Sequence, residues 1–379
     1  AGATPQQKEA QAQQALALFR TLGDQYWEAT TLSLIATAHF VASSYDKAAD
    51  GYTQTLSVWR TLSDRNNEAR TLIDLGWAYQ QSRNLPKATA CYEQALQLAR
   101  AGKNRLGEMQ ALSNLAEVED APGRGEKAIE YLSQTFSFSR THKDQHFETR
   151  VLRRLATAYS KERRYGEAER AYQQAHALSQ QTKEPMLEAQ LLLDTGWFHF
   201  TQGQYPRGQE YADQSLSIFR ERQSKRGEAA VRLLLGSLAG AQGAYEKAVS
   251  QFEQGLSLQR EIANKNGEAL LLTQLGYTCF LLGQYEKSLT YNSQALTLYR
   301  AGGSRAFEGV TLSNIGEVYL KLEQLAKARE YLEQGATLSR QAEGSERYET
   351  LNLLGETHRL QRQYEQARGY YEKALSLSR

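Results

Sequence analysis

Apolar residues recur along the chain with the spacing of amphipathic helices. One pair of such patterns consists of Leu72, Leu75, Gly76 and Tyr79, followed by Ala88, Tyr92, Ala95 and Leu96. Each pattern follows the i, i+3, i+4, i+7 spacing that places apolar side chains on one face of a helix. Only a short polar link, residues 81–85, separates the two patterns. We therefore expect an antiparallel helical hairpin.

The hairpin pattern repeats every 40 residues along most of the chain. Glutamate marks this period at Glu28, Glu68, Glu108, Glu148, Glu188, Glu228, Glu268 and Glu308, and arginine at Arg20, Arg60, Arg100, Arg140, Arg220, Arg260, Arg300 and Arg340. One residue is lost after Arg340, so the last unit has an offset of 39. We expect nine helix pairs over about 28–379. We also expect residues 1–27 to hold the second helix of a further unit whose first helix is absent. This organisation predicts a single solenoid over 1–379 that begins inside a longer array.

The residue types at corresponding positions of the 40-residue units resemble the tetratricopeptide repeat. That family's pattern places a large apolar residue, Leu-Gly, Tyr, Ala, an aromatic residue and Ala at fixed offsets. The second unit matches it with Leu72, Leu75-Gly76, Tyr79, Ala88, Tyr92 and Ala95, and the eighth with Leu312, Ile315-Gly316, Tyr319, Ala328, Leu332 and Gly335. The resemblance implies an all-α, right-handed superhelical solenoid of antiparallel hairpins, with a concave groove lined mainly by first helices.

The 40-residue form is similar to the repeats of kinesin light chains, of Pins-type polarity scaffolds and of bacterial signalling proteins. The resemblance therefore implies a scaffold or adaptor that binds a protein or peptide segment in its groove. An alternative is a sensor or autoregulatory array of a larger signalling protein, with a protease or ATPase switch as its effector. A peptide-pheromone receptor is a third class that fits the fold.

Composition excludes several functions. The chain has 45 Lys and Arg against 43 Asp and Glu, a net charge of +2, so bulk charge does not favour nucleic-acid binding. No apolar run reaches the ~18–20 residues of a membrane span. Cys91 and Cys279 are too few for a disulfide framework or a multi-cysteine metal site. No phosphate-binding loop or nucleophile elbow is present. We expect a cytoplasmic protein without catalysis, cofactor or metal, and we favour a monomer.

The recurring glutamates and the histidines favour structural roles. Each glutamate begins a first helix, where it meets the positive end of the helix dipole and can pair with the arginine that closes the preceding helix. His39, His199 and His358 stand where other units have Tyr79 or Tyr159, so we expect packed or half-buried side chains. His142 and His146 have the i, i+4 spacing that can bring two ligands to one metal ion, but no third ligand is near them in the sequence.

Polar residues of the third and fourth units form the strongest candidate site. Some tetratricopeptide domains hold a ligand's terminal carboxylates with five side chains on three successive first helices. Matched by position, this chain offers Asn114, Arg150 and Arg154, whereas Ile73 and Trp77 stand at the first two places. Two guanidinium groups and an amide can bind a carboxylate. Arg153 points elsewhere on the helix and widens the positive field. The alternative is that Asp74, Glu117 or Asp120 neutralises these arginines.

Aromatic residues on other first helices extend the candidate groove. Trp77, Trp197 and Tyr277 occupy one equivalent position, and Phe200 and Phe280 follow the last two by three residues; Asn314 with Glu317 repeats the pattern of Asn114 with Glu117. Exposed aromatic residues suit a peptide groove. We therefore expect a ligand segment bearing acidic and apolar residues. The alternative is that these rings pack against neighbouring helices.

The sixth unit differs from the others. Gly236 and Gly240 both lie inside its first helix, Ala239 replaces the usual Tyr, and Arg232 replaces a Leu. Each glycine lowers helix stability by ~1 kcal/mol relative to alanine. We expect a flexible region here, unless neighbouring side chains refill the space.

Overall fold

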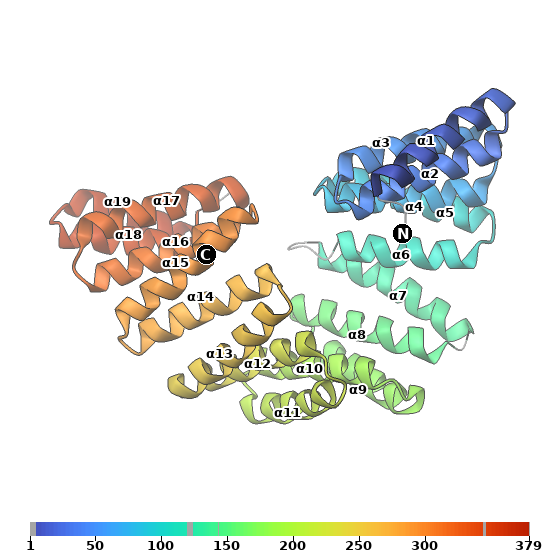
Figure 1. The fold of residues 1–379 in the computed structure, drawn as a ribbon. Helices are drawn as coiled ribbons and strands as arrows, with labels where there is room; N and C mark the ends of the chain where they lie inside the picture. The colour runs from blue at the N-terminus through green and yellow to red at the C-terminus, as the bar shows by residue number, and fades with distance from the viewer. Residues whose placement is uncertain (1–4, 120–123, 143, 344–345, 379) are drawn as a thin grey trace. The chain divides into compact units, whose positions relative to one another are not determined.

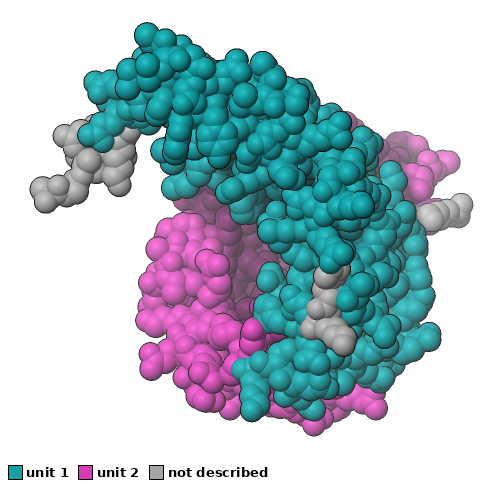
Figure 2. All heavy atoms as spheres, turned by 90° about the vertical axis from the view of Figure 1, so that its right-hand side faces the viewer, with its two compact units in different colours: residues 1–183 teal, residues 184–379 magenta. Residues whose placement is uncertain are grey.

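The computed structural model describes residues 5–119, 124–142, 144–343 and 346–378. The chain forms two compact units, residues 1–183 and 184–379 (Figure 2). Within the described ranges the chain forms nineteen α-helices and no strand (Figure 1). The first helix is single and the other eighteen follow as nine consecutive pairs, which confirms the expected all-α architecture of helical hairpins. The single solenoid over 1–379 stays a prediction.

Unit 1 contains the single helix and four pairs. Its helices are α1 (Pro5–Leu22), α2 (Gln25–Val41), α3 (Tyr45–Thr61), α4 (Arg65–Gln81), α5 (Leu85–Ala101), α6 (Arg105–Val118), α7 (Gly125–His142), α8 (Gln145–Lys161) and α9 (Tyr165–Thr182). Even-numbered helices are the first helices of the pairs, and odd-numbered helices from α3 onward are the second helices. Each helix packs on its neighbours in sequence, and α4 also contacts α6.

Unit 2 contains the remaining five pairs. Its helices are α10 (Pro185–Thr201), α11 (Tyr205–Glu221), α12 (Lys225–Ala241), α13 (Tyr245–Glu261), α14 (Lys265–Leu281), α15 (Tyr285–Ala301), α16 (Arg305–Lys321), α17 (Leu325–Glu343), α18 (Tyr348–Leu360) and α19 (Tyr364–Leu377). Here too the first helices of neighbouring pairs touch, as in α10 with α12 and α14 with α16.

Local sequence explains why the helices begin and end so regularly. Several first helices begin after a side chain that caps the free N–H groups: Asp64 accepts from the N–H of Asn67 (3.0 Å) and Asn104 from that of Gly107 (3.1 Å). The three-residue turns before these helices contain a residue with positive φ, as at Lys103 (φ 52°). Such a residue ends a helix sharply, because it leaves the right-handed region. These turns therefore separate one hairpin from the next.

Large and small residues pack against each other within each hairpin. In the second pair, Tyr92 is fully buried and its ring lies against the backbone of Gly76, where a β-carbon would meet Cε1 at 2.6 Å. The Tyr92 hydroxyl donates to Oε1 of Gln80 at 2.8 Å. Burial of such rings removes apolar area from water, worth roughly 25 cal/mol per Å². The glycine of the repeat therefore permits close contact between the two helices.

The recurring arginines and glutamates form ion pairs along both units, as the sequence predicts. The pairs, with distances from arginine Nε to glutamate Oε1, are Arg20–Glu28 (2.8 Å), Arg60–Glu68 (2.8 Å), Arg100–Glu108 (2.9 Å), Arg140–Glu148 (3.9 Å), Arg220–Glu228 (2.9 Å), Arg260–Glu268 (2.8 Å) and Arg300–Glu308 (2.8 Å). Some arginines also reach the next second helix: Arg100 Nη2 donates to Oε1 of Gln134 at 2.7 Å. The repeating charges therefore tie neighbouring hairpins together within each unit.

Candidate functional site

The polar cluster of unit 1 lies on the adjacent first helices α6 and α8. Six residues of α8 are buried (Thr149, Val151, Leu152, Leu155, Ala156 and Ala158), and this leaves Arg150 exposed and Arg154 half-buried. Arg154 Nη2 donates to the carbonyl oxygen of Ser113 on α6 at 3.2 Å. Its guanidinium group thus contacts the residue that precedes Asn114, whose own side chain is half-buried. Arg150 lies one helical turn from Arg154 on the same face of α8.

Arg153 lies on a different face of α8 from Arg150 and Arg154, and its side chain is half-buried. Two of the acidic groups that could neutralise the cluster, Glu117 and Asp74, interact with other residues. Glu117 accepts from Gln80 Nε2 at 3.0 Å, which links α6 to α4. Burial raises the pKa of Asp74 to about 6, and the charge that opposes this shift is that of Arg70. Asp120 lies outside the described residues. Among the described residues Arg150 makes no ion pair, so a guanidinium group is exposed to solvent on this face.

Trp77 lies on α4, next to this cluster in the order of first helices. Its indole stacks on the ring of Phe40 from α2, with centroids 5.4 Å apart and an interplanar angle of 28°. Nevertheless 49% of its surface is exposed. The stacking holds the ring in place while it leaves one side open to solvent. Such a half-supported aromatic ring can cover an apolar group of a ligand.

The aromatic residues expected in unit 2 differ in exposure. Tyr277 on α14 is 48% exposed. Trp197 and Phe200 on α10 are only partly exposed and contact each other edge to face at 5.4 Å. Phe200 also lies 6.0 Å from the ring of Tyr205, at the start of the next helix.

Phe280 resembles Phe200 in its packing. It is half-buried, and its ring lies 5.9 Å from that of Tyr285, the first residue of α15. Asn314 on α16 is likewise half-buried. Trp197, Phe200 and Phe280 therefore contribute to hairpin packing, and Tyr277 is the most exposed of the aromatic side chains proposed for unit 2.

The sequence of each hairpin identifies the family. The family model described as the tetratricopeptide repeat matches residues 27–101, 107–181, 187–261, 267–341 and 307–379. The chain belongs to the tetratricopeptide repeat family. Its helices α2 to α19 are thus tetratricopeptide hairpins, and α1 precedes the first matched segment.

Solved structures of low sequence identity share this fold. A Signal Transduction ATPase with Numerous Domains that carries a tetratricopeptide repeat sensor, from Pyrococcus horikoshii, aligns with 91% of this chain at 16% identity and a TM-score of 0.62. The present chain covers 53% of that protein, about half its length. The apo form of the quorum sensor NprR from B. thuringiensis aligns at 15% identity and a TM-score of 0.61, over 90% of this chain and 99% of that one.

A third similar structure is aspartyl phosphate phosphatase F from Bacillus subtilis. It aligns at 14% identity and a TM-score of 0.53, over 81% of this chain and 93% of that one. No curated protein matches the sequence. These likenesses concern the fold of the tetratricopeptide array.

Three histidine side chains in the tetratricopeptide hairpins are packed or half-buried, as the sequence predicts. His199 stacks on Tyr211, with centroids 5.2 Å apart, and His358 stacks on Tyr370 at the same distance. His39 is half-buried. The side chain of His142 lies outside the described residues. Burial raises the pKa of the Cys91 thiol to about 11, which disfavours the reactive thiolate.

Two further features concern metal binding and membrane insertion. Across the described parts of the chain, no three side chains of His, Cys, Asp or Glu are grouped so that they could hold a metal ion. None of the helices in those parts combines the length and apolar character needed to cross a membrane.

Proposed function

We propose that this tetratricopeptide array binds a protein or peptide segment, and that a carboxylate of the segment lies across Asn114, Arg150 and Arg154. The observation that supports this most directly is the contact of Arg154 with the carbonyl of Ser113. It brings a guanidinium group of α8 to the residue that precedes Asn114 on α6. Charge-assisted hydrogen bonds from such groups contribute roughly 1.5–3 kcal/mol each.

In this proposal an apolar side chain of the ligand packs against Trp77. The indole is half-exposed and supported from behind by Phe40. Arg153 adds positive charge to the same helix without contacting the carboxylate. The ligand is therefore a segment that combines an acidic or C-terminal carboxylate with a neighbouring apolar residue.

Charge reversal at the cluster tests the proposal. Arrays of acidic, neutral and basic peptides, each made with a free and with an amidated C-terminus, would be incubated with the parent chain and with the double variant Arg150→Glu, Arg154→Glu. We expect the parent to retain acidic or carboxylate-terminated peptides and the double variant to lose them. The matched control is Arg65→Glu with Lys127→Glu, which makes the same change in charge at exposed positions outside the cluster.

Helicity and the melting temperature must be measured for both double variants. The proposal is wrong if the Arg150/Arg154 variant is folded and binds the same peptides as the parent. Recognition would then lie in unit 2, along Trp197, Phe200, Tyr277 and Phe280, with Asn314 as its polar member. Tyr277→Ala would be the first variant to test there, because its ring is the most exposed of these aromatic side chains.

A second candidate function is a sensor array within a larger signalling protein. It is supported by the similarity to a protein described as an ATPase with a tetratricopeptide repeat sensor, of which this chain covers about half. The sequence of the full-length gene product distinguishes the two functions. An ATPase or protease domain joined to the array supports the sensor, and an array without an effector domain supports the scaffold.

A further inference from the structure

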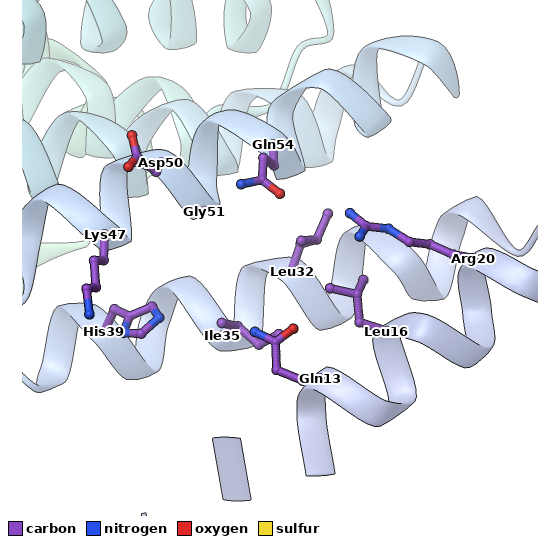
Figure 3. A pocket seen from close by; sticks show the side chains of 10 residues that line it. All are labelled: Gln13, Leu16, Arg20, Leu32, Ile35, His39, Lys47, Asp50, Gly51 and Gln54. Atoms are coloured by element: carbon purple, nitrogen blue, oxygen red, sulfur yellow. The ribbon is translucent and has the colours of Figure 1, made fainter. Parts of the chain in front are cut away.

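A cavity of about 290 Å³ lies where α1, α2 and α3 meet in unit 1 (Figure 3). We call it the α1–α3 pocket. Its apolar surface is formed by Leu16 of α1 with Leu32 and Ile35 of α2, all of them buried. Polar side chains from all three helices surround this surface, among them Gln13 of α1 and His39 of α2. The pocket therefore combines an apolar floor with hydrogen-bonding groups at its edge.

Comparison of the repeats within this chain explains why the space is open. Gly51 lines the pocket, and five of the other eight repeats carry a tyrosine at the equivalent position: Tyr131, Tyr211, Tyr291, Tyr331 and Tyr370. The other three carry Cys91, Ala171 and Gln251. The ring of Tyr211 stacks on His199 with an interplanar angle of 6°. His199 is the equivalent of His39, 160 residues or four repeats later. The α1–α3 pocket is thus the slot that other repeats fill with their own tyrosine ring.

The stacking is a recurring property of this slot. Tyr331 stacks on Tyr319 with centroids 5.4 Å apart, and Tyr370 stacks on His358 at 5.2 Å. Tyr319 and His358 are also equivalents of His39. In each of three repeats a planar side chain at this position supports a phenol ring. His39 places a planar imidazole ring at the equivalent position, at the edge of the pocket (Figure 3).

The slot also recognises the hydroxyl group of its tyrosine in one repeat. The Tyr291 hydroxyl donates to Oε1 of Glu253, on the preceding second helix α13, at 3.2 Å. Six repeats earlier, the equivalent of Glu253 is Gln13. Its amide oxygen can accept the same hydrogen bond. Gln13 lines the α1–α3 pocket from α1, the helix that corresponds to α13.

Close packing prevents the chain from filling the pocket with a side chain at position 51. A β-carbon on Gly51 would meet the β-carbon of Ala36 at 2.8 Å and its Cα at 3.3 Å. Helix α3 therefore lies closer to α2 than a tyrosine at this position allows. The groups that surround a phenol ring are retained, while the ring itself is absent from the chain.

We propose that the α1–α3 pocket binds one phenolic ring, stacked on His39, with its hydroxyl group donating to Gln13. The ring belongs either to a free small phenol or to a tyrosine side chain of a peptide. This site lies on α1 to α3 and is independent of the carboxylate site on α6 and α8.

The test uses the intact chain with labelled isoleucine and leucine methyl groups, because three such residues form the pocket floor. Titration with p-cresol, the tyrosine side-chain analogue, should shift the methyl resonances of Leu16, Leu32 and Ile35. Toluene has the same ring without the hydroxyl, and we expect it to bind about fivefold to tenfold more weakly, as the loss of one hydrogen bond implies.

Substitutions at Gln13 separate hydroxyl recognition from unspecific binding. Gln13→Leu should reduce the affinity for p-cresol to that for toluene. Gln13→Glu should retain the preference for p-cresol, since Glu253 accepts the hydroxyl in the equivalent slot. Thr53→Leu is the matched control, because Thr53 is the exposed equivalent of Gln13 in the next repeat. It should leave both affinities unchanged.

His39→Ala should weaken p-cresol and toluene together, because it removes the stacking surface. N-acetyltyrosinamide distinguishes the two sources: binding at least as tight as that of p-cresol assigns the pocket to a peptide-borne tyrosine, and binding of p-cresol alone assigns it to a free phenol. The proposal is overturned if p-cresol leaves the three floor residues unshifted. It is also overturned if folded Gln13→Leu prefers p-cresol as the parent does.

Discussion

The ring of Phe252 on α13 occupies the space in which a side chain on Gly236 of α12 would lie. A β-carbon at position 236 would meet Cε1 of Phe252 at 2.3 Å. Phe252 is only 2% exposed, so its ring has little room to move. One turn later on α12, Gly240 is in a different situation, because the nearest atom to its virtual β-carbon is the Ala248 Cβ at 3.9 Å. Two glycines of one helix thus have different structural roles.

Alanine at these two positions should therefore change stability in opposite directions. Gly236→Ala forces the Phe252 ring to shift, and we expect a net loss of about 1–2 kcal/mol after the gain in helix propensity. Gly240→Ala meets no obstacle and should add up to about 1 kcal/mol. Urea unfolding midpoints and hydrogen exchange of α12 and α13 measure both effects. Destabilisation by Gly240→Ala would show that the helices require glycine there as well.

Arg232, on the same helix, is an arginine at a buried position. Its side chain is 7% exposed, Nη1 donates to Oε1 of Gln251 at 2.6 Å, and Nη2 donates to Oε1 of Glu228 at 3.3 Å. In the described parts of the chain its Nε has no hydrogen-bond partner. Burial of a charge with incomplete hydrogen bonding costs free energy that an apolar side chain avoids.

We therefore expect Arg232→Leu to be neutral or to raise the free energy of unfolding by about 1–2 kcal/mol. Leucine is the residue at the equivalent position of most other repeats, and Glu228 keeps its pair with Arg220 at 2.9 Å. Arg232→Ala is the matched variant, which should destabilise because it leaves a cavity. Urea unfolding of both variants tests this. A large loss of stability in Arg232→Leu would mean that the bond to Gln251 outweighs the cost of burial.

The sixth repeat shows how far sequence reasoning reached. Arg232 is buried where the equivalent positions of other repeats have leucine, whereas the contact of Gly236 with Phe252 is the same as that of Gly76 with Tyr92. The sequence could not reveal that Gln251 bonds to Arg232, since this bond depends on side-chain conformations across a hairpin. The expected flexibility of this region stays a prediction. Lower amide protection in α12 and α13 than in α14 and α15 would support it.

The periodic features were the most predictable. The pairing of Arg60 with Glu68 and of its equivalents follows from a 40-residue period and the geometry of consecutive helices. The α1–α3 pocket was missed, although Gly51 in place of Tyr131 and Tyr211 was a signal in the sequence. The carboxylate site remains a prediction, because its ligand-binding geometry depends on how Arg150 and Arg154 extend from α8.

Asp74 provides a test by pH. Burial raises the pKa of its carboxyl group from 3.8 to about 6, so the folded protein binds a proton there more tightly than the unfolded chain. Above pH 6 the charged form is buried at a cost. As the pH falls through 6, the folded state takes up the proton first and gains stability until about pH 4.

Asp74→Asn should accordingly stabilise the protein at pH 7, by at most about 2–3 kcal/mol, since one pKa unit corresponds to about 1.4 kcal/mol. The gain should shrink below pH 6 and vanish near pH 4. Thermal unfolding between pH 4 and 8 measures it, and Asp46→Asn, at an exposed position of α3, is the control. An equal gain at pH 4 and pH 7 would assign the effect to something other than the buried charge.

Glu268 should show the opposite dependence on pH. Burial alone would raise the pKa of its carboxyl group, but hydrogen bonds from Arg260 Nε at 2.8 Å and Lys265 Nζ at 3.0 Å lower it below 4.5. The unfolded chain then binds the proton more tightly. The stabilisation is complete above pH 4.5 and is lost as the pH falls through the lower pKa of the folded state.

Glu268→Gln should therefore cost about 1–2 kcal/mol at pH 7 and much less near pH 3. Glu148→Gln is the matched control, because Glu148 holds the same place in its repeat but lies 3.9 Å from Arg140 Nε. It should cost less at every pH. Thermal unfolding of both variants between pH 3 and 7 decides the matter. If both lose the same stability, the charge at the helix N-terminus stabilises the repeat and the short bond to Arg260 adds nothing to it.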